Sequence, residues 1–328
     1  MFNALVLHET DKEPDVKIQQ LSDTDLPDDE VLVAVDYSSI NYKDALAVTG
    51  TGKIVRGDFP FVPGIDLAGE VVASRDPAFK EGDKVIGNGW GLGEAHWGGY
   101  AQRMRVKSKS LVPMPAGMTS KQAMVFGTAG FTAMLSVISL ELHGLTPERG
   151  EVVVTGATGG VGSFSLMLLS QLGFEAVASS GKKHAHDYLK SIGASRIIDR
   201  SVLGDGPSRP LDKGKWAGAI DSVGGPALSA IISQMKRHGS VAACGLANSH
   251  ALDTTVFPFI LRGVNLLGID TSTCAYERRC EVWARLGEVP AAQVEAIAEV
   301  VSLAEVLAIS KRMMDSNIKG RIVVDLNR

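Results

Sequence analysis

Two patterns of hydrophobic and polar residues divide the chain. Residues 1 to about 122 hold short β-like runs broken by Pro and Gly, which is typical of a β domain. From about residue 123, apolar stretches of helix length alternate with runs of β-branched residues, and this alternation predicts a doubly wound parallel sheet. After about residue 290 a strand-like run, a helix and a closing strand follow. The strands expected in the first part are 4–7, 31–36, 68–73, 84–86 and 100–106.

The middle of the chain is expected to open with a helix pair at 123–142 and then to alternate strands with helices. The closing strand, 320–326, is expected to rejoin the N-terminal β domain, and 205–210 is expected to be a surface loop. We therefore predict one domain from 1–122 and 291–328 and a second from 123–290. The expected strands are 151–155, 175–179, 196–199, 217–221, 240–244, 266–270 and 298–302, and the expected helices are 161–172, 185–192, 226–237 and 276–286.

Composition narrows the class of protein. The 328 residues carry 33 Lys and Arg against 37 Asp and Glu, a net charge of −4, and 45% are hydrophobic, as in ordinary globular proteins. Scattered basic residues offer no stripe for a phosphate backbone, so nucleic acid is not an expected partner. No run of 18 apolar residues and no signal-peptide pattern occurs at the start, which favours a cytoplasmic protein without a membrane partner.

The three cysteines argue against a metal-stapled or disulfide-stapled fold. Cys244, Cys274 and Cys280 are odd in number and form no Cys-x-x-Cys motif. A zinc ribbon needs more ligands than these, and ordinary thiols in a reducing compartment are expected instead.

A glycine-rich turn follows the strand expected at 151–155. The segment 156–162 reads Gly-Ala-Thr-Gly-Gly-Val-Gly, and a helix is expected directly behind it. Small residues there allow a tight turn and close approach of backbone amides to a pyrophosphate at the helix start. We expect a dinucleotide to contact Thr158, Gly159, Gly160 and Val161 in this turn.

The end of the next strand indicates which dinucleotide is bound. An NAD-binding strand usually ends in Asp or Glu, but this one ends in Ser180-Gly181-Lys182, and Arg200 follows the third strand. A hydroxyl, an amide and two cations suit a 2′-phosphate, so NADPH is the expected cofactor. A further turn, around Leu246, follows a later strand and is expected to lie at the same ligand-binding edge.

Four motifs carry a resemblance that covers essentially the whole chain. They are Asn-Tyr-Lys-Asp at 41–44, Pro-Gly-Ile-Asp at 63–66, Trp-Gly-Leu-Gly at 90–93 and Gly-Thr-Ala-Gly-Phe-Thr-Ala at 127–133. The chain resembles the zinc-independent medium-chain dehydrogenase/reductases of the quinone oxidoreductase group, and within it the acryloyl-CoA reductases. The resemblance implies a GroES-like β-barrel domain formed by both chain ends and a Rossmann domain between them.

The same resemblance implies a reaction without a metal. Zinc-dependent relatives carry Gly-His-Glu and a four-cysteine lobe, whereas Gly64-Ile65-Asp66 stands here and no cysteine precedes Cys244. His96, between glycines and tryptophans, is expected to be structural rather than a ligand. The implied chemistry is hydride addition to an activated C=C bond of a coenzyme A thioester, for which the protein supplies orientation and hydrogen-bond donors.

Tyr42 is the expected donor, because a phenol stays protonated at neutral pH and can bind an oxyanion or the nicotinamide ribose. A packed ring with a wet tip is the alternative for this residue. The resemblance places the matching Tyr on the cofactor, Asn317 on the nicotinamide side, and Arg321 on the substrate carbonyl or a phosphate. Asn41 and Asp44 either position Tyr42 or serve as a turn former and a solvated charge.

Other residues have two interpretations. Asn88 and Trp90 either wall a short acyl pocket or belong to a packed hairpin, and surface cations either bind the coenzyme A nucleotide or maintain solubility. Those cations are Lys43, Lys53, Arg56 and Arg105.

Three functions stay open from the sequence: a reductase of short enoyl thioesters, a quinone or enone reductase, and a noncatalytic NADPH-binding protein. The run 266–273 looks like an edge strand able to extend its sheet across a two-fold axis, so a homodimer is expected.

Overall fold

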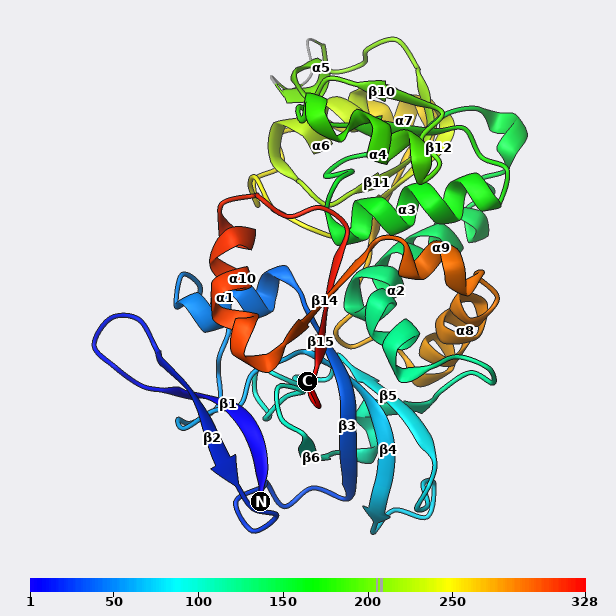
Figure 1. The fold of residues 1–328 in the computed structure, drawn as a ribbon. Coiled ribbons are helices and arrows are strands. Elements are labelled where there is room, and N and C mark those ends of the chain that lie inside the picture. Colours follow the sequence, from blue (N-terminus) through cyan, green and yellow to red (C-terminus); the bar gives the residue numbers. More distant parts are fainter. Residues whose placement is uncertain (205, 207–208) are drawn as a thin grey trace. The chain divides into compact units, whose positions relative to one another are not determined.

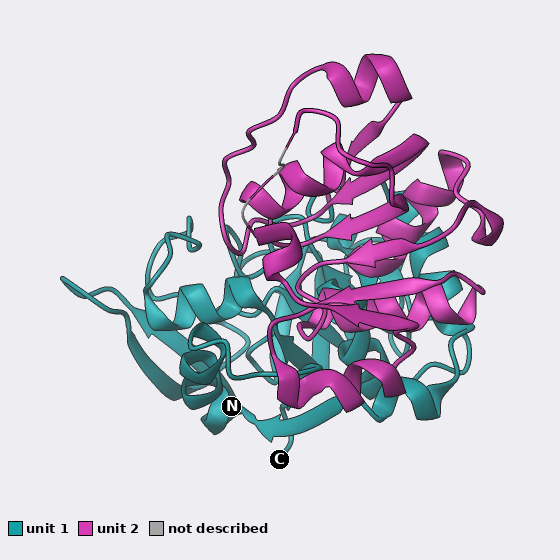
Figure 2. Cartoon of the chain, turned by 90° about the horizontal axis from the view of Figure 1, so that it is seen from above, with its two compact units in different colours: residues 1–131, 271–328 teal, residues 132–270 magenta. Residues whose placement is uncertain are grey.

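The computed structural model describes residues 1–204, 206 and 209–328, so the loop expected at 205–210 lies partly outside the described residues. The chain forms two compact units: unit 1 is Met1–Phe131 with Thr271–Arg328, and unit 2 is Thr132–Asp270. Figure 2 draws them in teal and magenta. The expected domain boundaries, after residues 122 and 290, remain a prediction.

Unit 1 is built on a mainly antiparallel sheet around β3 (Val31–Ile40), which pairs with β4, β6 and β15. The closing strand β15 therefore returns to the N-terminal sheet, as the sequence predicts (Figure 1). The sheet order is β14 (Ala298–Ser302), β15 (Arg321–Asp325), β3, β4 (Asp66–Ser74), β5 (Lys84–Asn88) and β7 (Leu111–Pro113), with β6 (Arg103–Val106) on β3 and a separate hairpin of β1 (Phe2–His8) and β2 (Asp15–Leu21).

Apolar side chains along β1, β3 and β15 form the core of unit 1, where Val31, Val33 and Val324 are fully buried. The hairpin strand β2 was not expected from sequence, because its Asp-Val-Lys-Ile-Gln-Gln-Leu run does not keep a strict alternation of apolar and polar residues and none of its residues is fully buried. The helices of unit 1 are α1 (Tyr42–Thr49), α8 (Tyr276–Gly287), α9 (Ala291–Glu295) and α10 (Val306–Met314), with 3-10 turns η1 (Ser108–Ser110) and η4 (Leu303–Glu305).

Unit 2 is a parallel sheet of six strands in the order β10-β9-β8-β11-β12-β13. Numbered along the chain, this order is 3-2-1-4-5-6, the doubly wound arrangement that the alternating pattern predicts. Its strands are β8 (Val152–Val154), β9 (Ala176–Ser179), β10 (Arg196–Ile198), β11 (Trp216–Asp221), β12 (Met235–Ala243) and β13 (Asn265–Gly268), and its helices and 3-10 turns are α3 (Gly160–Gln171), α4 (His186–Ser191), α5 (Ser201–Gly204), α6 (Gly225–Ser233), α7 (Phe257–Arg262), η2 (Pro147–Arg149) and η3 (Lys183–Ala185).

The helix expected at 226–237 is too long. Helix α6 ends at Ser233, and the chain enters β12 at Met235, which pairs with Trp216 of β11. The register shifts before Ser240 pairs with Gly218, and His238 adopts a positive φ of 58° in between. The bulge at the start of the strand breaks the two-residue alternation typical of a strand, so the sequence pattern there resembles a helix.

Helix α2 (Ser120–Leu142) is the expected helix pair, merged across a break. Gly127 has φ 48° and ψ −155°, so the helical path stops and restarts at this residue. By length and composition α2 could cross a membrane, but 89% of its apolar window is buried inside the protein, as in a core helix.

Candidate active site and cofactor site

The glycine turn of unit 2 links β8 to α3. Gly156 has φ 57°, a conformation that L side chains rarely adopt, and a Cβ on Gly162 would overlap the carbonyl of Gly156. Gly159, at the N-cap of α3, has no side chain to cap the helix amides, so these donors can face a bound anion. The structure thus brings Thr158, Gly159, Gly160 and Val161 together in one turn, with Thr158 buried and Gly159 exposed.

The expected 2′-phosphate residues lie together at the end of β9. Ser180 N donates to Ile198 O of β10 at 3.0 Å, and the Ser180 hydroxyl accepts from Lys182 N at 3.1 Å. A Cβ on Gly181 would lie 2.9 Å from Arg200 Nε, which shows that the Arg200 side chain lies across this glycine. Hydroxyl, amide and guanidinium are therefore adjacent, and no acidic residue ends the strand.

Asp221, at the end of β11, ties the neighbouring turns to the glycine loop. Thr155 Oγ1 donates to Asp221 Oδ1 at 2.6 Å, and Gly224 N donates to Asp221 Oδ2 at 2.8 Å. Burial raises the pKa of Asp221, and these hydrogen bonds oppose that rise. Leu246 lies in the following turn and is 64% exposed, while its neighbour Ala247 donates its amide to Ser222 O at 3.2 Å.

In unit 1, Tyr42 is the first residue of α1 and is 48% exposed. The helix start is fixed by a capping box. Asn41 N and Asn41 Nδ2 donate to Asp44 Oδ2 at 2.8 and 3.1 Å, and Ile65 N donates to Asp44 Oδ1 at 2.8 Å. Asn41 and Asp44 are buried, which excludes a solvated charge for Asp44 and makes them the support of Tyr42.

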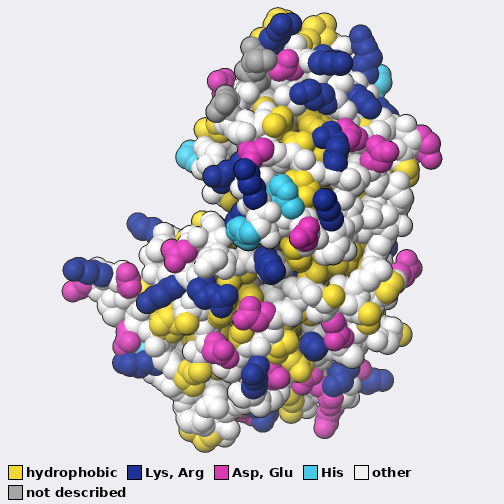
Figure 3. Space-filling view, turned by 45° about the horizontal axis from the view of Figure 1, so that its top comes forward, with side chains coloured by type: hydrophobic (Ala, Val, Ile, Leu, Met, Phe, Trp, Pro, Cys, Tyr) yellow, Lys and Arg dark blue, Asp and Glu magenta, His cyan; other side chains and the backbone are white. Residues whose placement is uncertain are grey.

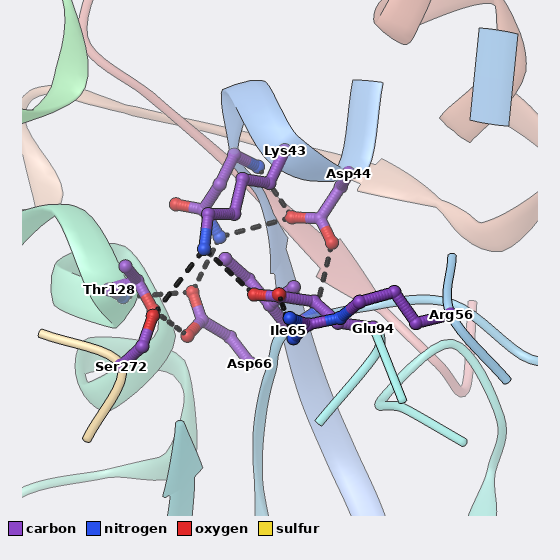
Figure 4. A network of polar contacts seen from close by, with 9 residues as sticks. Lys43, Asp44, Arg56, Ile65, Asp66, Glu94, Thr128 and Ser272 are labelled. Atoms are coloured by element: carbon purple, nitrogen blue, oxygen red, sulfur yellow. Dashed lines mark hydrogen bonds and ion pairs between the residues drawn. The ribbon is translucent and has the colours of Figure 1, made fainter. Parts of the chain in front are cut away.

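A second buried carboxylate, Asp66 at the start of β4, lies beside this cap (Figure 4). Asp66 Oδ2 accepts from Ser39 Oγ at 2.6 Å, from Asn41 Nδ2 at 2.7 Å and from Thr128 N at 2.9 Å. Its other oxygen, Oδ1, accepts from Thr128 Oγ1 at 2.6 Å. Asp66 therefore caps the restarted half of α2 just after the break at Gly127.

The two carboxylates influence each other. Burial, followed by the charge of Asp66, raises the pKa of Asp44 from 3.8 to about 7, although three donated hydrogen bonds act in the opposite direction. A buried acid with a pKa near neutrality is a property shared by structural networks and functional sites.

Arg321, expected to contact the substrate carbonyl or a phosphate, is 3% exposed and belongs to the same network. Its Nε donates to Val125 O at 2.9 Å, its Nη2 to Ser39 Oγ at 2.8 Å, and its Nη1 to Asn41 Oδ1 at 3.1 Å. Every guanidinium nitrogen is therefore used inside unit 1. The geometry favours a positioning role for Arg321, because direct contact with a thioester would break these bonds.

The remaining candidate residues lie in different surroundings. Asn317 is exposed in the turn after α10, and its amide donates to Arg312 O at 3.0 Å. Asn88 is fully buried and therefore belongs to the packed interior rather than to an open pocket wall. His96 Nε2 lies 3.0 Å from Lys107 Nζ.

The surface cations expected to bind the coenzyme A nucleotide do not all lie together. Lys43 Nζ and Arg56 Nη2 each lie 2.8 Å from a different oxygen of Glu94 (Figure 4). Arg105 instead lines a pocket of about 370 Å³ together with Arg75 and Asp28. On the face drawn in Figure 3, Lys and Arg side chains are interspersed with Asp and Glu. Within the described residues, no group of three or more His, Cys, Asp or Glu side chains could hold a metal ion.

Comparisons with known proteins agree with this architecture. Residues 27–116 match the family described as "Alcohol dehydrogenase GroES-like domain", and residues 160–287 match "Zinc-binding dehydrogenase". The acrylyl-CoA reductase AcuI of Ruegeria pomeroyi is 47% identical over 330 residues, covering 100% of both chains.

Two solved structures span nearly the whole chain. YhdH of Escherichia coli K-12 with bound NADPH is 48% identical, with a TM-score of 0.95 over 99% of this chain and 100% of that one. YhfP of Bacillus subtilis, which carries the provisional name quinone oxidoreductase, was solved with NAD bound. It is 45% identical, with a TM-score of 0.96 over 99% of each chain.

These full-length matches confirm the fold class predicted from the sequence, a GroES-like domain with a Rossmann-type parallel sheet. The chain belongs to the medium-chain dehydrogenase/reductase family.

Proposed function

We propose that this protein reduces the C=C bond of a short enoyl thioester, acryloyl-CoA to propanoyl-CoA, with NADPH. The observation that carries the proposal is the 47% identity to an acrylyl-CoA reductase over the full length of both chains. The four sequence motifs at 41–44, 63–66, 90–93 and 127–133 lie in that matched length.

The residues of unit 2 fit NADPH. The bare amides at the start of α3 suit its pyrophosphate, while Ser180, Lys182 and Arg200 suit the 2′-phosphate. A Cβ at Gly156, Gly162 or Gly181 would fill the cradle or displace its neighbours, as expected where a ligand approaches the backbone closely. When bound, NADPH supplies the hydride.

The residues of unit 1 bind and orient the substrate and the cofactor. The hydroxyl of the half-exposed Tyr42 donates a hydrogen bond either to the thioester oxygen, where it stabilises negative charge, or to the cofactor. The capping box of Asn41 and Asp44 fixes the first turn of α1 that carries Tyr42. Arg321 holds Asn41 from the other side, and Asn317 supplies an exposed amide for the nicotinamide.

A substrate panel tests the proposal. Purified protein is assayed with NADPH and acryloyl-CoA, crotonoyl-CoA or a simple quinone. Higher kcat/KM for acryloyl-CoA than for the quinone supports enoyl thioester reduction. Brisk quinone turnover without acryloyl-CoA turnover assigns a quinone reductase, the alternative favoured by the provisional name of the Bacillus subtilis relative. No turnover of any substrate, with NADPH still bound, assigns a noncatalytic binding protein.

We also propose a homodimer in the cytoplasm. Strand β13 is an edge strand of the sheet in unit 2, and its Leu266 is 36% exposed, so backbone groups and apolar surface are available to a second copy. Light scattering that gives the mass of a single chain at micromolar concentration contradicts the dimer. Recovery of the protein in a membrane or secreted fraction contradicts the location.

A further inference from the structure

The sequence motifs of unit 1 meet at the first turn of α1. The motif at 41–44 forms this turn. The motif at 63–66 contacts the turn through two hydrogen bonds, and the motif at 127–133 contacts Asp66 through two more. Segments far apart in the chain are therefore assembled around the start of one short helix.

The Trp-Gly-Leu-Gly motif forms a tight turn directly before Glu94. Trp90, Gly91 and Gly93 have positive φ values of 53°, 85° and 70°. Glu94 N donates to Gly91 O at 3.0 Å, which closes the turn. A Cβ on Gly93 would lie 2.6 Å from the carbonyl carbon of Gly64, so glycine is needed for this close approach of two backbones. The turn therefore fixes the backbone that carries the Glu94 side chain.

Glu94 joins this turn to α1 by holding Lys43. Its side chain is 14% exposed, and Oε1 lies 2.8 Å from Lys43 Nζ. Its Oε2 lies 2.8 Å from Arg56 Nη2, and its carbonyl accepts from Arg56 N at 2.6 Å. Lys43 Nζ also donates to Ser272 Oγ at 3.4 Å, so the ammonium bridges Glu94 and Ser272 (Figure 4). An ammonium has three N–H donors, and no acceptor among the described residues takes the third.

Two side chains of residues 41–45 reach the surface. Tyr42 is 48% exposed and the Lys43 side chain 43% exposed, whereas Asn41, Asp44 and Ala45 are buried. The converging motifs thus fix a turn that offers one phenol and one ammonium. The phenol supplies a single hydrogen bond, so the ammonium is a second group available for chemistry.

Reduction of an enoyl thioester needs a proton as well as a hydride. When the hydride adds to the β-carbon, the electron pair of the C=C bond moves toward the thioester oxygen and an enolate forms. The α-carbon must then take a proton from a general acid, a role that lysine can perform. Asp44 and Asp66 are buried among protein donors, which leaves the half-exposed ammonium of Lys43 as the acid at this turn.

We propose that Lys43 Nζ donates this proton, an inference that rests on the proposed reduction of an enoyl thioester. The α-carbon forms its new C–H bond as one N–H bond of Lys43 breaks, and the electron pair of that bond stays on the nitrogen. Solvent water then returns a proton to the amine through the exposed part of the side chain. Glu94 is a positioning residue, because it fixes Nζ at the start of α1.

Lys43→Met removes the proton and keeps a side chain of similar length. Its kcat for acryloyl-CoA is expected to fall by about 100-fold or more, with the NADPH dissociation constant unchanged in a fluorescence titration. Lys84→Met is the matched control, because Lys84 also lies in unit 1, is 51% exposed and lies 2.8 Å from the carboxylate of Glu70. The control should keep the wild-type kcat. Equal kcat values for the two variants overturn the role of Lys43.

A truncated substrate distinguishes proton donation from binding of the coenzyme A phosphates. Acryloyl-pantetheine has the same reacting atoms but lacks the nucleotide. Because both substrates need the proton, Lys43→Met should lose kcat/KM by the same factor with each. A loss confined to acryloyl-CoA and expressed in KM would assign Lys43 to the phosphates and overturn the proposal.

Solvent deuterium distinguishes proton donation from charge stabilisation. In D2O the wild type should place deuterium at the α-carbon in one configuration, as NMR of a chiral derivative of the product reveals. The slow turnover of Lys43→Met should give both configurations, since water then delivers the proton. A large loss of kcat with one configuration retained overturns proton donation by Lys43. A wild-type enzyme that does not reduce acryloyl-CoA overturns the proposed function itself, and the role of Lys43 with it.

Discussion

Asp66 and Thr128 are joined by two hydrogen bonds, from Thr128 N at 2.9 Å and from Thr128 Oγ1 at 2.6 Å. The carboxylate thereby caps the helix that restarts after Gly127 and also accepts from Ser39 and Asn41. One side chain thus connects β4, α2 and the start of α1, the helix that carries Tyr42.

Removal of the Asp66 carboxylate should destabilise the folded protein. Asp66 is the first of the charges that raise the pKa of the buried Arg321, ahead of Asp44, so its loss removes the largest balancing charge and leaves the cap of α2 without its acceptor. Asp66→Ala is expected to lower the free energy of unfolding by about 3–5 kcal/mol. Urea unfolding measures the change, with the exposed Asp58→Ala as control, expected within about 0.5 kcal/mol of wild type. Equal stability of the two variants would show that the network contributes little.

A substitution at Gly127 tests the same contact between Asp66 and the restarted helix by filling the space beside it. A Cβ there would lie 2.5 Å from Asp66 Oδ2, 2.7 Å from Ser39 Oγ and 2.8 Å from Arg321 Nη2, at a positive φ of 48°. Gly127→Ala is therefore expected to cost about 3 kcal/mol or more, since overlap adds to backbone strain.

Gly82→Ala separates these two terms. Gly82 also has a positive φ, 87°, but a Cβ on this residue would meet nothing within 4 Å, so only strain of about 1–2 kcal/mol is expected. Chemical unfolding of both variants checks the difference, and similar losses would remove the argument from overlap.

Sequence reasoning predicted best those features that depend on residues adjacent in the chain or on the ends of neighbouring strands. The glycine turn at 156–162 combines a strand, small residues and a helix in one stretch. Gly181 lies against Arg200 because adjacent parallel strands end at one edge of the sheet. The cap of Thr128 by Asp66 spans 62 residues, and the contact of Arg279 with Asn88 spans 191. Hydrophobic periodicity within a short stretch of sequence cannot predict contacts between residues this far apart.

Burial explains the other differences. Arg321 and Asp44 read as charged candidates for a ligand site or for solvent, but the fold places both inside unit 1 among hydrogen-bond partners. Whether a charge is buried depends on which strands cover it, and β15 reaches β3 from the far end of the chain. Strand β2 was not predicted because its apolar residues break strict alternation at Gln20 and are only partly buried.

Stability should depend on pH through Asp44. Its pKa rises from 3.8 to about 7 on folding, so between these pH values the folded state keeps a proton that the unfolded state has lost. This group therefore makes stability fall as pH rises from about 4 to about 7, by roughly 3–4 kcal/mol. Urea unfolding of wild type and Asp44→Asn across this range tests the slope, which should be less negative in the variant. Parallel profiles would contradict the titration of Asp44 in this window.

Cofactor choice should depend on Arg200. A charged hydrogen bond to the 2′-phosphate is worth about 1.5–3 kcal/mol, so Arg200→Ala should raise the KM for NADPH roughly 10- to 150-fold. The KM for NADH, which lacks that phosphate, should stay nearly unchanged. Steady-state kinetics with both cofactors measure the ratio, and the exposed Arg328→Ala, in unit 1, serves as control. An equal effect on both cofactors would place Arg200 away from the 2′-phosphate.

Tyr42 should orient the substrate or cofactor rather than act as an obligatory acid. Hydride transfer belongs to the cofactor, so Tyr42→Phe loses one hydrogen bond worth about 1–3 kcal/mol and roughly 10- to 200-fold in kcat/KM for acryloyl-CoA. Tyr276→Phe is the matched control, because Tyr276 is 43% exposed against 48% for Tyr42 and also lies at the start of a helix. Complete loss of activity in Tyr42→Phe would give the phenol a chemical role beyond orientation. Unchanged kinetics would assign Tyr42 to packing alone, since its hydroxyl would then contact neither the thioester nor the cofactor in the transition state.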